Sequence, residues 1–98
     1  MKTRTAERIV QNYILELPEP KCNIKQSNFC QRSYTKWAAE EVLRTIRKRK
    51  DISPIASVEE FIGKMEYYAC HRPDLSYIFS IAYDVGVDIL DTLLAVDD

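Results

Sequence analysis

The sequence predicts an all-α protein, a single compact four-helix bundle of 98 residues. Apolar residues recur at intervals of three and four in four segments, which is the spacing of one face of a helix. Nowhere do apolar and polar residues alternate in the manner of a β-strand. Prolines and polar residues separate the segments, and the connections before the third and fourth are short, as between antiparallel neighbours.

The longest segment, residues 74–96, is also the most apolar. As a helix with a rise of 1.5 Å per residue it would be roughly 35 Å long. Its predicted core seam consists of Leu75, Phe79, Ala82, Gly86, Ile89 and Leu93, widened by Ile78, Val85, Leu90 and Val96. A glycine in such a seam predicts that another helix passes close to its backbone.

The first helix is expected at residues 5–17, with Thr5 as a candidate N-cap. Its apolar face consists of Ile9, Val10, Tyr13, Ile14 and Leu17. Residues 18–32 then contain two prolines and no helical period. Because this segment also contains Ile24 and Phe29, which a packed loop would bury, we expect an ordered loop between helices one and two.

The second helix is expected at residues 34–50, with Ser33 or Thr35 as its cap. Its apolar face consists of Ala39, Val42, Leu43 and Ile46. The polar turn around Pro54 ends it, because the residue before a proline is disfavoured in a helix.

The third helix is expected at residues 58–71. A capping box, in which Ser57 and Glu60 satisfy each other's exposed amides, would start it. Its apolar face consists of Val58, Phe61, Ile62, Met65, Tyr68 and Ala69. Pro73 would end it and would suit the first turn of the fourth helix.

Charge is divided unevenly along the chain, although the net charge is only −1. Residues 1–50 contain twelve Lys/Arg and five Asp/Glu, a net of +7, whereas residues 51–98 contain two and ten, a net of −8. Such a division is typical either of a half that binds a polyanion or of two halves with complementary surfaces. We favour complementary surfaces, because antiparallel packing would partly cancel the two fields.

Three cysteines, Cys22, Cys30 and Cys70, form no C-x-x-C pair, and no secretory or membrane-spanning segment is evident. The chain is therefore expected in the cytoplasm with reduced thiols. Together with His71 the cysteines would give one full set of zinc ligands, but two of these are adjacent, whereas structural zinc ligands usually lie two to four residues apart. We expect no metal, no other cofactor and no membrane association.

Catalytic motifs are not evident either. The sequence lacks the signatures of dinucleotide-binding proteins, P-loop proteins, serine hydrolases and zinc proteases. Cys70 and His71 would be the one pairing of a nucleophile with a base, but neighbouring side chains on a helix point about 100° apart. A histidine that interacts with the last carbonyls of the helix is the better interpretation, and we expect that the protein is not an enzyme.

The basic end of the second helix is the strongest nucleic-acid signal. The candidate contacts are Trp37, Arg44, Arg47, Lys48 and Lys50. On a helical wheel Trp37 lies on the side of Arg44 and Lys48, so its ring would stack on a base while the cations contact phosphates. Alternatively, the cations only stabilise the helix C-terminus, and the loop covers the tryptophan.

The side of the fourth helix opposite its core seam is the candidate protein-binding surface. The residues are Asp84, Asp88, Asp91 and Tyr77, with Tyr67 on the back of the third helix. Tyrosines among carboxylates are typical of protein interfaces in which an aromatic ring is the buried anchor and polar residues form the rim around it. The aspartates, about 5 Å apart along the helix, would also suit a mimic of a phosphate backbone. Pairing with the basic half of the chain is the simpler explanation.

No motif identifies a family. The leading hypothesis is a non-enzymatic protein-binding module whose partner has a basic surface. Its size, lack of catalytic motifs and divided charge suggest, by analogy of class, a small regulator or inhibitor of the anti-defence type that phages and mobile elements encode. The alternative is a nucleic-acid-binding protein. The sequence leaves the oligomeric state open.

Overall fold

Four α-helices make up the computed structural model, which describes residues 1–18 and 31–97. They are α1 (Thr3–Glu16), α2 (Gln31–Lys48), α3 (Pro54–His71) and α4 (Ser76–Asp97), with a 3₁₀ turn, η1 (Pro73–Leu75), before α4. The predicted all-α four-helix fold is confirmed. Residues 19–30, which contain Ile24, Phe29 and two of the cysteines, lie outside the described residues, and so does most of the expected loop.

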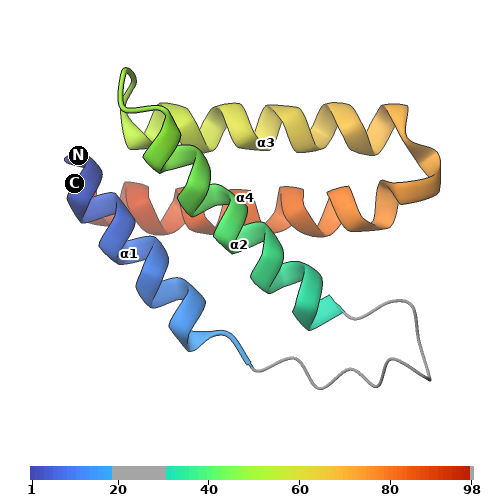
Figure 1. Ribbon diagram of the computed structural model, residues 1–98, viewed down its shortest axis with the longest axis horizontal. Helices are drawn as coiled ribbons and strands as arrows, with labels where there is room; N and C mark the ends of the chain where they lie inside the picture. The colour runs from blue at the N-terminus through green and yellow to red at the C-terminus, as the bar shows by residue number, and fades with distance from the viewer. Residues whose placement is uncertain (19–30, 98) are drawn as a thin grey trace.

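The helices form two layers (Figure 1). α3 and α4 make one antiparallel pair, and α1 and α2 make a second pair that crosses the first at an angle. α2 packs on both helices of the other layer, and α1 packs on α4. The connections between α2 and α3 and between α3 and α4 are only a few residues long, which is why consecutive helices lie antiparallel.

The seam of α4 faces the centre of the molecule, as predicted. Its buried members are Ala82, Val85, Gly86, Ile89 and Leu93, and Phe79 packs at the edge of the same core. Across from them lie the buried side chains Val10, Val42, Ile46, Val58, Phe61 and Met65 of the other three helices. Val96 is 55% exposed, because the last turn of α4 is not covered on that side.

Gly86 of α4 lies in close contact with α3. A Cβ atom at this position would lie 2.8 Å from Cγ1 of Ile62 and 3.2 Å from Cδ1 of Phe61. Carbon atoms in contact normally lie about 3.5–4.0 Å apart, so a side chain at position 86 would displace α3. The predicted close passage of a second helix is confirmed.

The first three helices start earlier than predicted, whereas α4 starts at Ser76, two residues later, after the 3₁₀ turn. α1 begins at Thr3, and its N-cap residue Lys2 makes no side-chain cap hydrogen bond, so the predicted Thr5 cap is wrong. α2 begins at Gln31, which makes Ser33 and Thr35 internal residues rather than caps. Thr35 instead donates its hydroxyl to the carbonyl oxygen four residues earlier, at 2.8 Å. At the start of α1, therefore, no capping hydroxyl marks the first turn.

α3 begins one turn before the predicted start. Ser53 is its N-cap, and the Ser53 Oγ accepts a hydrogen bond from a backbone N–H of the first turn at 3.1 Å. Ser57, the expected cap, is buried inside the helix with its Oγ 3.5 Å from the carbonyl oxygen of Arg49. The predicted capping box is wrong because two serines four residues apart offered competing starts, and Pro54 favours the one that places it first in the helix.

The two glycines of the chain give a matched test of the α3–α4 contact. Gly86→Leu should lower the free energy of unfolding by roughly 1–3 kcal/mol because of overpacking, and Gly86→Ala should also be destabilising. Gly63 has no atom within 4 Å of an added Cβ, so Gly63→Ala should stabilise the protein by up to about 1 kcal/mol, because alanine favours helix. Urea unfolding of the three variants measures this, and a stabilised Gly86→Ala variant would contradict the contact.

The start of α3 gives a second test. Ser53→Ala removes the cap and should lower the free energy of unfolding by about 1 kcal/mol. Ser57→Ala should change it by no more than about 0.5 kcal/mol, because the serine hydroxyl makes only a long contact there. The reverse order of the two effects in thermal unfolding would restore the predicted capping box.

Candidate functional site

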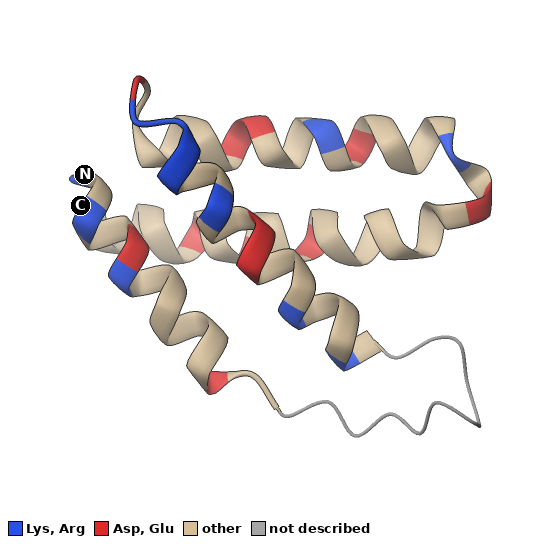
Figure 2. Cartoon of the chain, viewed as in Figure 1, with Lys and Arg blue, Asp and Glu red and all other residues tan. Residues whose placement is uncertain are grey.

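Positively and negatively charged residues are distributed unequally between the two layers (Figure 2). α1 and α2 together contain seven Lys/Arg and four Asp/Glu, a net of +3. α3 and α4 contain one Lys and seven Asp/Glu, a net of −6. The division along the sequence has therefore become a division between layers.

The two halves of the chain are joined by the ion pairs of Arg49. Its guanidinium donates to Glu60 at 2.7 Å and to Asp51 at 3.1 Å. The hydrogen bond and charge of Arg49 hold the pKa of Asp51 below its usual value. The described ion pairs of Arg44 with Glu41, and of Arg47 with a glutamate of α1, stay within the basic half. The complementary packing that the sequence suggested is thus seen at Arg49, at the turn between the layers.

Four exposed carboxylates lie on the outer side of the α3–α4 layer. Glu59 and Glu66 on α3 are seven residues apart, as are Asp84 and Asp91 on α4, so each pair lies on one side of its helix, two turns apart. The two sides meet, because Glu66 and Asp84 line the same cavity of about 240 Å³ between the helices. We call these four carboxylates the acidic face. No ion pair is described for any of them among residues 1–18 and 31–97.

The lining of the acidic-face cavity is mostly small or apolar. It consists of Ala69, Cys70, Ser80 and Tyr83, together with the two carboxylates. Farther along α4, Leu94 is 43% exposed. The site therefore combines negative charge with a recess of small and apolar side chains.

Asp88 differs from the two other predicted aspartates. It accepts a hydrogen bond of 2.8 Å from the Tyr13 hydroxyl of α1. Partial burial raises the pKa of Tyr13 above its ordinary value of 10.0, and the hydrogen bond and negative charge of Asp88 raise it further. The hydrogen bond of Asp88 thus links α1 to α4, whereas no side-chain hydrogen bond or ion pair is described for Asp84 or Asp91.

The two predicted tyrosines lie on separate sides. Tyr77 is 44% exposed, and its ring meets that of Tyr34 of α2 edge to face, with centroids 6.2 Å apart. Tyr67 is 57% exposed and stacks on His71, with centroids 4.0 Å apart. The structure therefore does not bring Tyr67 to the aspartates. Glu59, Glu66 and Leu94 were missed, although the seven-residue spacing of the two glutamates was visible in the sequence.

Cys70 and His71 diverge, as their adjacency predicts. The Cys70 side chain is exposed and lines the acidic-face cavity. The His71 ring instead stacks on Tyr67, and its Nδ1 lies 2.8 Å from the Tyr67 carbonyl oxygen. The interaction of this histidine with a carbonyl of the last turn is confirmed.

Three of the five predicted nucleic-acid contacts lie along one side of α2. Trp37, Arg44 and Lys48 line a single groove against α3, while Lys50 is exposed in the following turn. The Arg47 Nε lies 4.0 Å from a carboxylate oxygen of Glu7. This pair places the start of α1, with its own arginines, beside the end of α2, a neighbourhood that the sequence could not show.

The Tyr13–Asp88 hydrogen bond can be tested by its pH dependence. Because folding raises the pKa of Tyr13, its contribution to stability is complete below about pH 10 and is lost as the pH rises further. Tyr13→Phe should therefore cost roughly 0.5–1.5 kcal/mol at pH 7 and should make the decline in stability above pH 10 shallower. Asp88→Asn should also flatten that decline. Parallel pH profiles of wild type and Tyr13→Phe in urea unfolding would contradict the bond.

Two further features of the described residues bear on the class of site. In residues 1–18 and 31–97, no helix has the length and apolar character needed to cross a membrane. In the same part of the chain, no three His, Cys, Asp or Glu side chains lie together as metal ligands. The predicted zinc alternative requires Cys22 and Cys30, which lie outside it. In comparisons with protein-family models, curated proteins and solved structures, the chain matched none.

Proposed function

We propose that this chain is a non-enzymatic protein-binding module whose acidic face docks on a basic surface of another protein. The observation that carries the proposal is the set of four carboxylates without described partners on one side of two adjacent helices. Within the two helices little positive charge opposes this face, because α4 has no Lys or Arg and the single lysine of α3, Lys64, lines the groove with α2 instead. Arg72, in the turn between the helices, pairs with Asp74. Such a face attracts a cationic surface and repels nucleic acid.

The recess between Glu66 and Asp84 indicates what the partner supplies. An arginine or lysine stem would cover the apolar lining, and its charged head would reach the carboxylates at the rim. Leu94 adds apolar area at the other end of the face. Affinity in such contacts comes from a buried anchor and specificity from the surrounding charges.

The proposal includes the finer expectations from the sequence. We place the protein in the cytoplasm and regard it as a small regulator or inhibitor that covers a functional surface of its partner. The divergence of Cys70 from His71 supports a role other than catalysis, because nucleophile and base must lie within hydrogen-bond reach.

The basic side is the weaker candidate for the principal function. Its cations are interspersed with glutamates, and Arg44 and Arg47 have carboxylate partners. Internal pairing reduces the charge that such a surface presents to a polyanion.

The test is capture of a partner from a lysate of the organism that encodes the chain, with two variants of equal charge. Asp84→Asn/Asp91→Asn should reduce retention of a specific partner at least about tenfold, because rim charges set encounter and register. Glu16→Gln/Glu40→Gln removes two exposed carboxylates from the other layer and should leave retention unchanged. Circular dichroism verifies that both variants are folded.

Two results would contradict the proposal. Equal loss of the partner in both variants would indicate non-specific ion exchange. Full retention by Asp84→Asn/Asp91→Asn would show that the acidic face is not the contact.

A further inference from the structure

The groove between α2 and α3 is a second concave surface, separate from the acidic face. It has a volume of about 290 Å³. Its main wall and floor residues are Trp37, Arg44 and Lys48 of α2 and Phe61, Lys64 and Met65 of α3. The groove thus combines the tryptophan ring, an apolar floor, four cations with Arg49 included, and the two carboxylates of Glu41 and Glu60.

Trp37 forms the aromatic end of the groove. Its side chain is 39% exposed, so part of the ring remains available to a ligand. The floor beneath is apolar, since Phe61 and Met65 are buried core residues. An exposed tryptophan face beside an apolar floor favours a ligand with a planar ring, because that ring could stack on the tryptophan.

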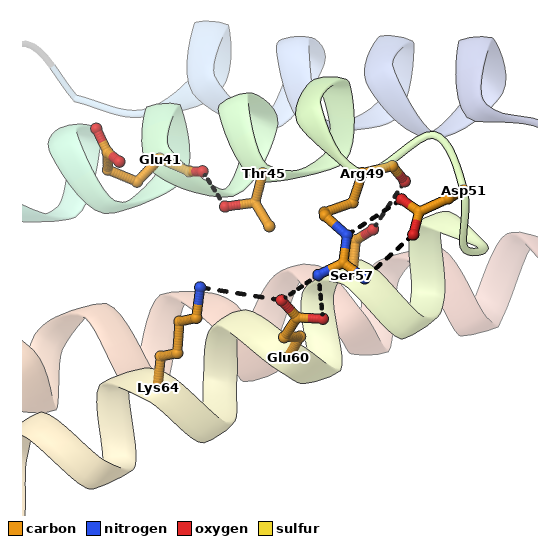
Figure 3. Close-up of polar contacts among 7 residues, drawn as sticks. All are labelled: Glu41, Thr45, Arg49, Asp51, Ser57, Glu60 and Lys64. Carbon is orange, nitrogen blue, oxygen red and sulfur yellow. Dashed lines mark hydrogen bonds and ion pairs between the residues drawn. The ribbon is translucent and has the colours of Figure 1, made fainter.

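The cations of the groove differ in how far they are already neutralised. Arg44 pairs with Glu41. Arg49 pairs with Glu60 beside the turn between α2 and α3 (Figure 3). The Lys64 Nζ lies 3.9 Å from the Glu60 carboxylate, which Arg49 already contacts more closely. No ion pair of Lys48 is described within residues 1–18 and 31–97. Lys48 and Lys64, on opposite walls, are therefore the cations most available to an external anion.

The spacing along α2 places the aromatic and cationic ends a short molecule apart. Trp37 and Arg44 are seven residues, or roughly 10 Å, apart, and Lys48 is one turn farther. The Lys48 side chain can extend back along the groove over that turn. A ligand with a planar ring at one end and an anionic group at the other matches this arrangement.

We infer that the groove binds a nucleobase joined to a phosphate, with the base stacked on Trp37 and the phosphate between Lys48 and Lys64. Glu41, which also lines the groove, supplies an acceptor for the amino groups or sugar hydroxyls of such a ligand. A free nucleotide and one unit of a single strand present the same chemistry. The inference is independent of the acidic face, which lies on the other side of α3.

Trp37 is the only tryptophan in the chain, so its intrinsic fluorescence reports on this groove directly. Adenosine and uridine monophosphates and an oligouridine of eight units are the probes, titrated at two salt concentrations. An eight-unit abasic phosphodiester and inorganic phosphate are the controls. We expect saturable quenching by the oligouridine, as a stacked base produces, and little change with either control.

The mononucleotides distinguish the two sources of the ligand. Saturable quenching by a mononucleotide indicates a free nucleotide, whereas quenching only by the oligouridine indicates a single strand. No saturable quenching by either class at millimolar nucleotide would overturn the inference. Equal quenching by the abasic chain would also overturn it, because the groove would then attract polyanions without reading a base.

A matched pair of double variants tests the two lysines. Lys48→Ala/Lys64→Ala should weaken binding about tenfold and lower the salt slope by roughly one, since about 0.7 of a counterion is released per contact to a single strand. Lys2→Ala/Arg8→Ala removes the same charge from exposed positions outside the groove and should have little effect. Equal weakening in both would overturn the assignment of the phosphate to the groove.

Trp37→Leu provides a check that does not depend on the fluorescent probe. Binding of the oligouridine to this variant, measured by calorimetry, should fall about tenfold if the base stacks on the ring. If the double lysine variant does not fold by circular dichroism, Lys48→Gln alone replaces it. Unchanged binding by a folded Trp37→Leu variant would overturn the stacking.

Discussion

The close contact of the Gly86 backbone with Phe61 and Ile62 is the constraint on which the architecture depends. It sets the distance between α3 and α4 below what two ordinary side chains would allow. Because the two helices are so close, their outward sides form one continuous surface, and Glu66 of one helix can share a cavity with Asp84 of the other. Their inward sides form one apolar platform, on which α2 packs across both.

The order of the helices in the chain explains how charge is arranged. Consecutive helices pair as hairpins, so the first half of the sequence becomes one layer and the second half becomes the other (Figure 1). Each layer buries its apolar side against the other and turns its charges outward. A division of charge along the sequence therefore becomes two oppositely charged outer sides, and direct neutralisation is concentrated where the chain passes between layers, at Arg49.

The buried faces of the helices were predictable from the sequence. Burial of one face requires apolar residues at the period of a helix, and each helix has at least 14 residues over which that period repeats. The orientation of α4 and the position of Trp37 beside Arg44 and Lys48 follow from that period alone. Helix starts were not predictable, since a start depends on one or two residues. At α3, for example, Ser53 and Ser57 could each have been the cap. The contacts that each helix makes with the other helices were not predictable either.

The candidate sites show the same limit. The period of α2 places Trp37 on a wheel but does not reveal that Lys64 forms the facing wall. Similarly, the spacing of Glu59 and Glu66 becomes meaningful only once the α3–α4 turn sets them against Asp84 and Asp91. Tyr67 was grouped with the aspartates because both lay off their core stripes, and a wheel cannot show that these are different sides of the layer.

The opposite placement of charge gives the molecule a large electric dipole despite a net charge of −1. The shortest dimension of the molecule is 21 Å, more than twice the screening length of about 8 Å at physiological ionic strength. In the cell each side therefore acts as an independent pole, and near a cationic surface the molecule experiences a torque before any contact forms. It would approach such a surface with the α3–α4 layer turned toward the surface and the α1–α2 layer turned away from it. In that orientation the side of α2 would point away from the surface that the molecule approaches.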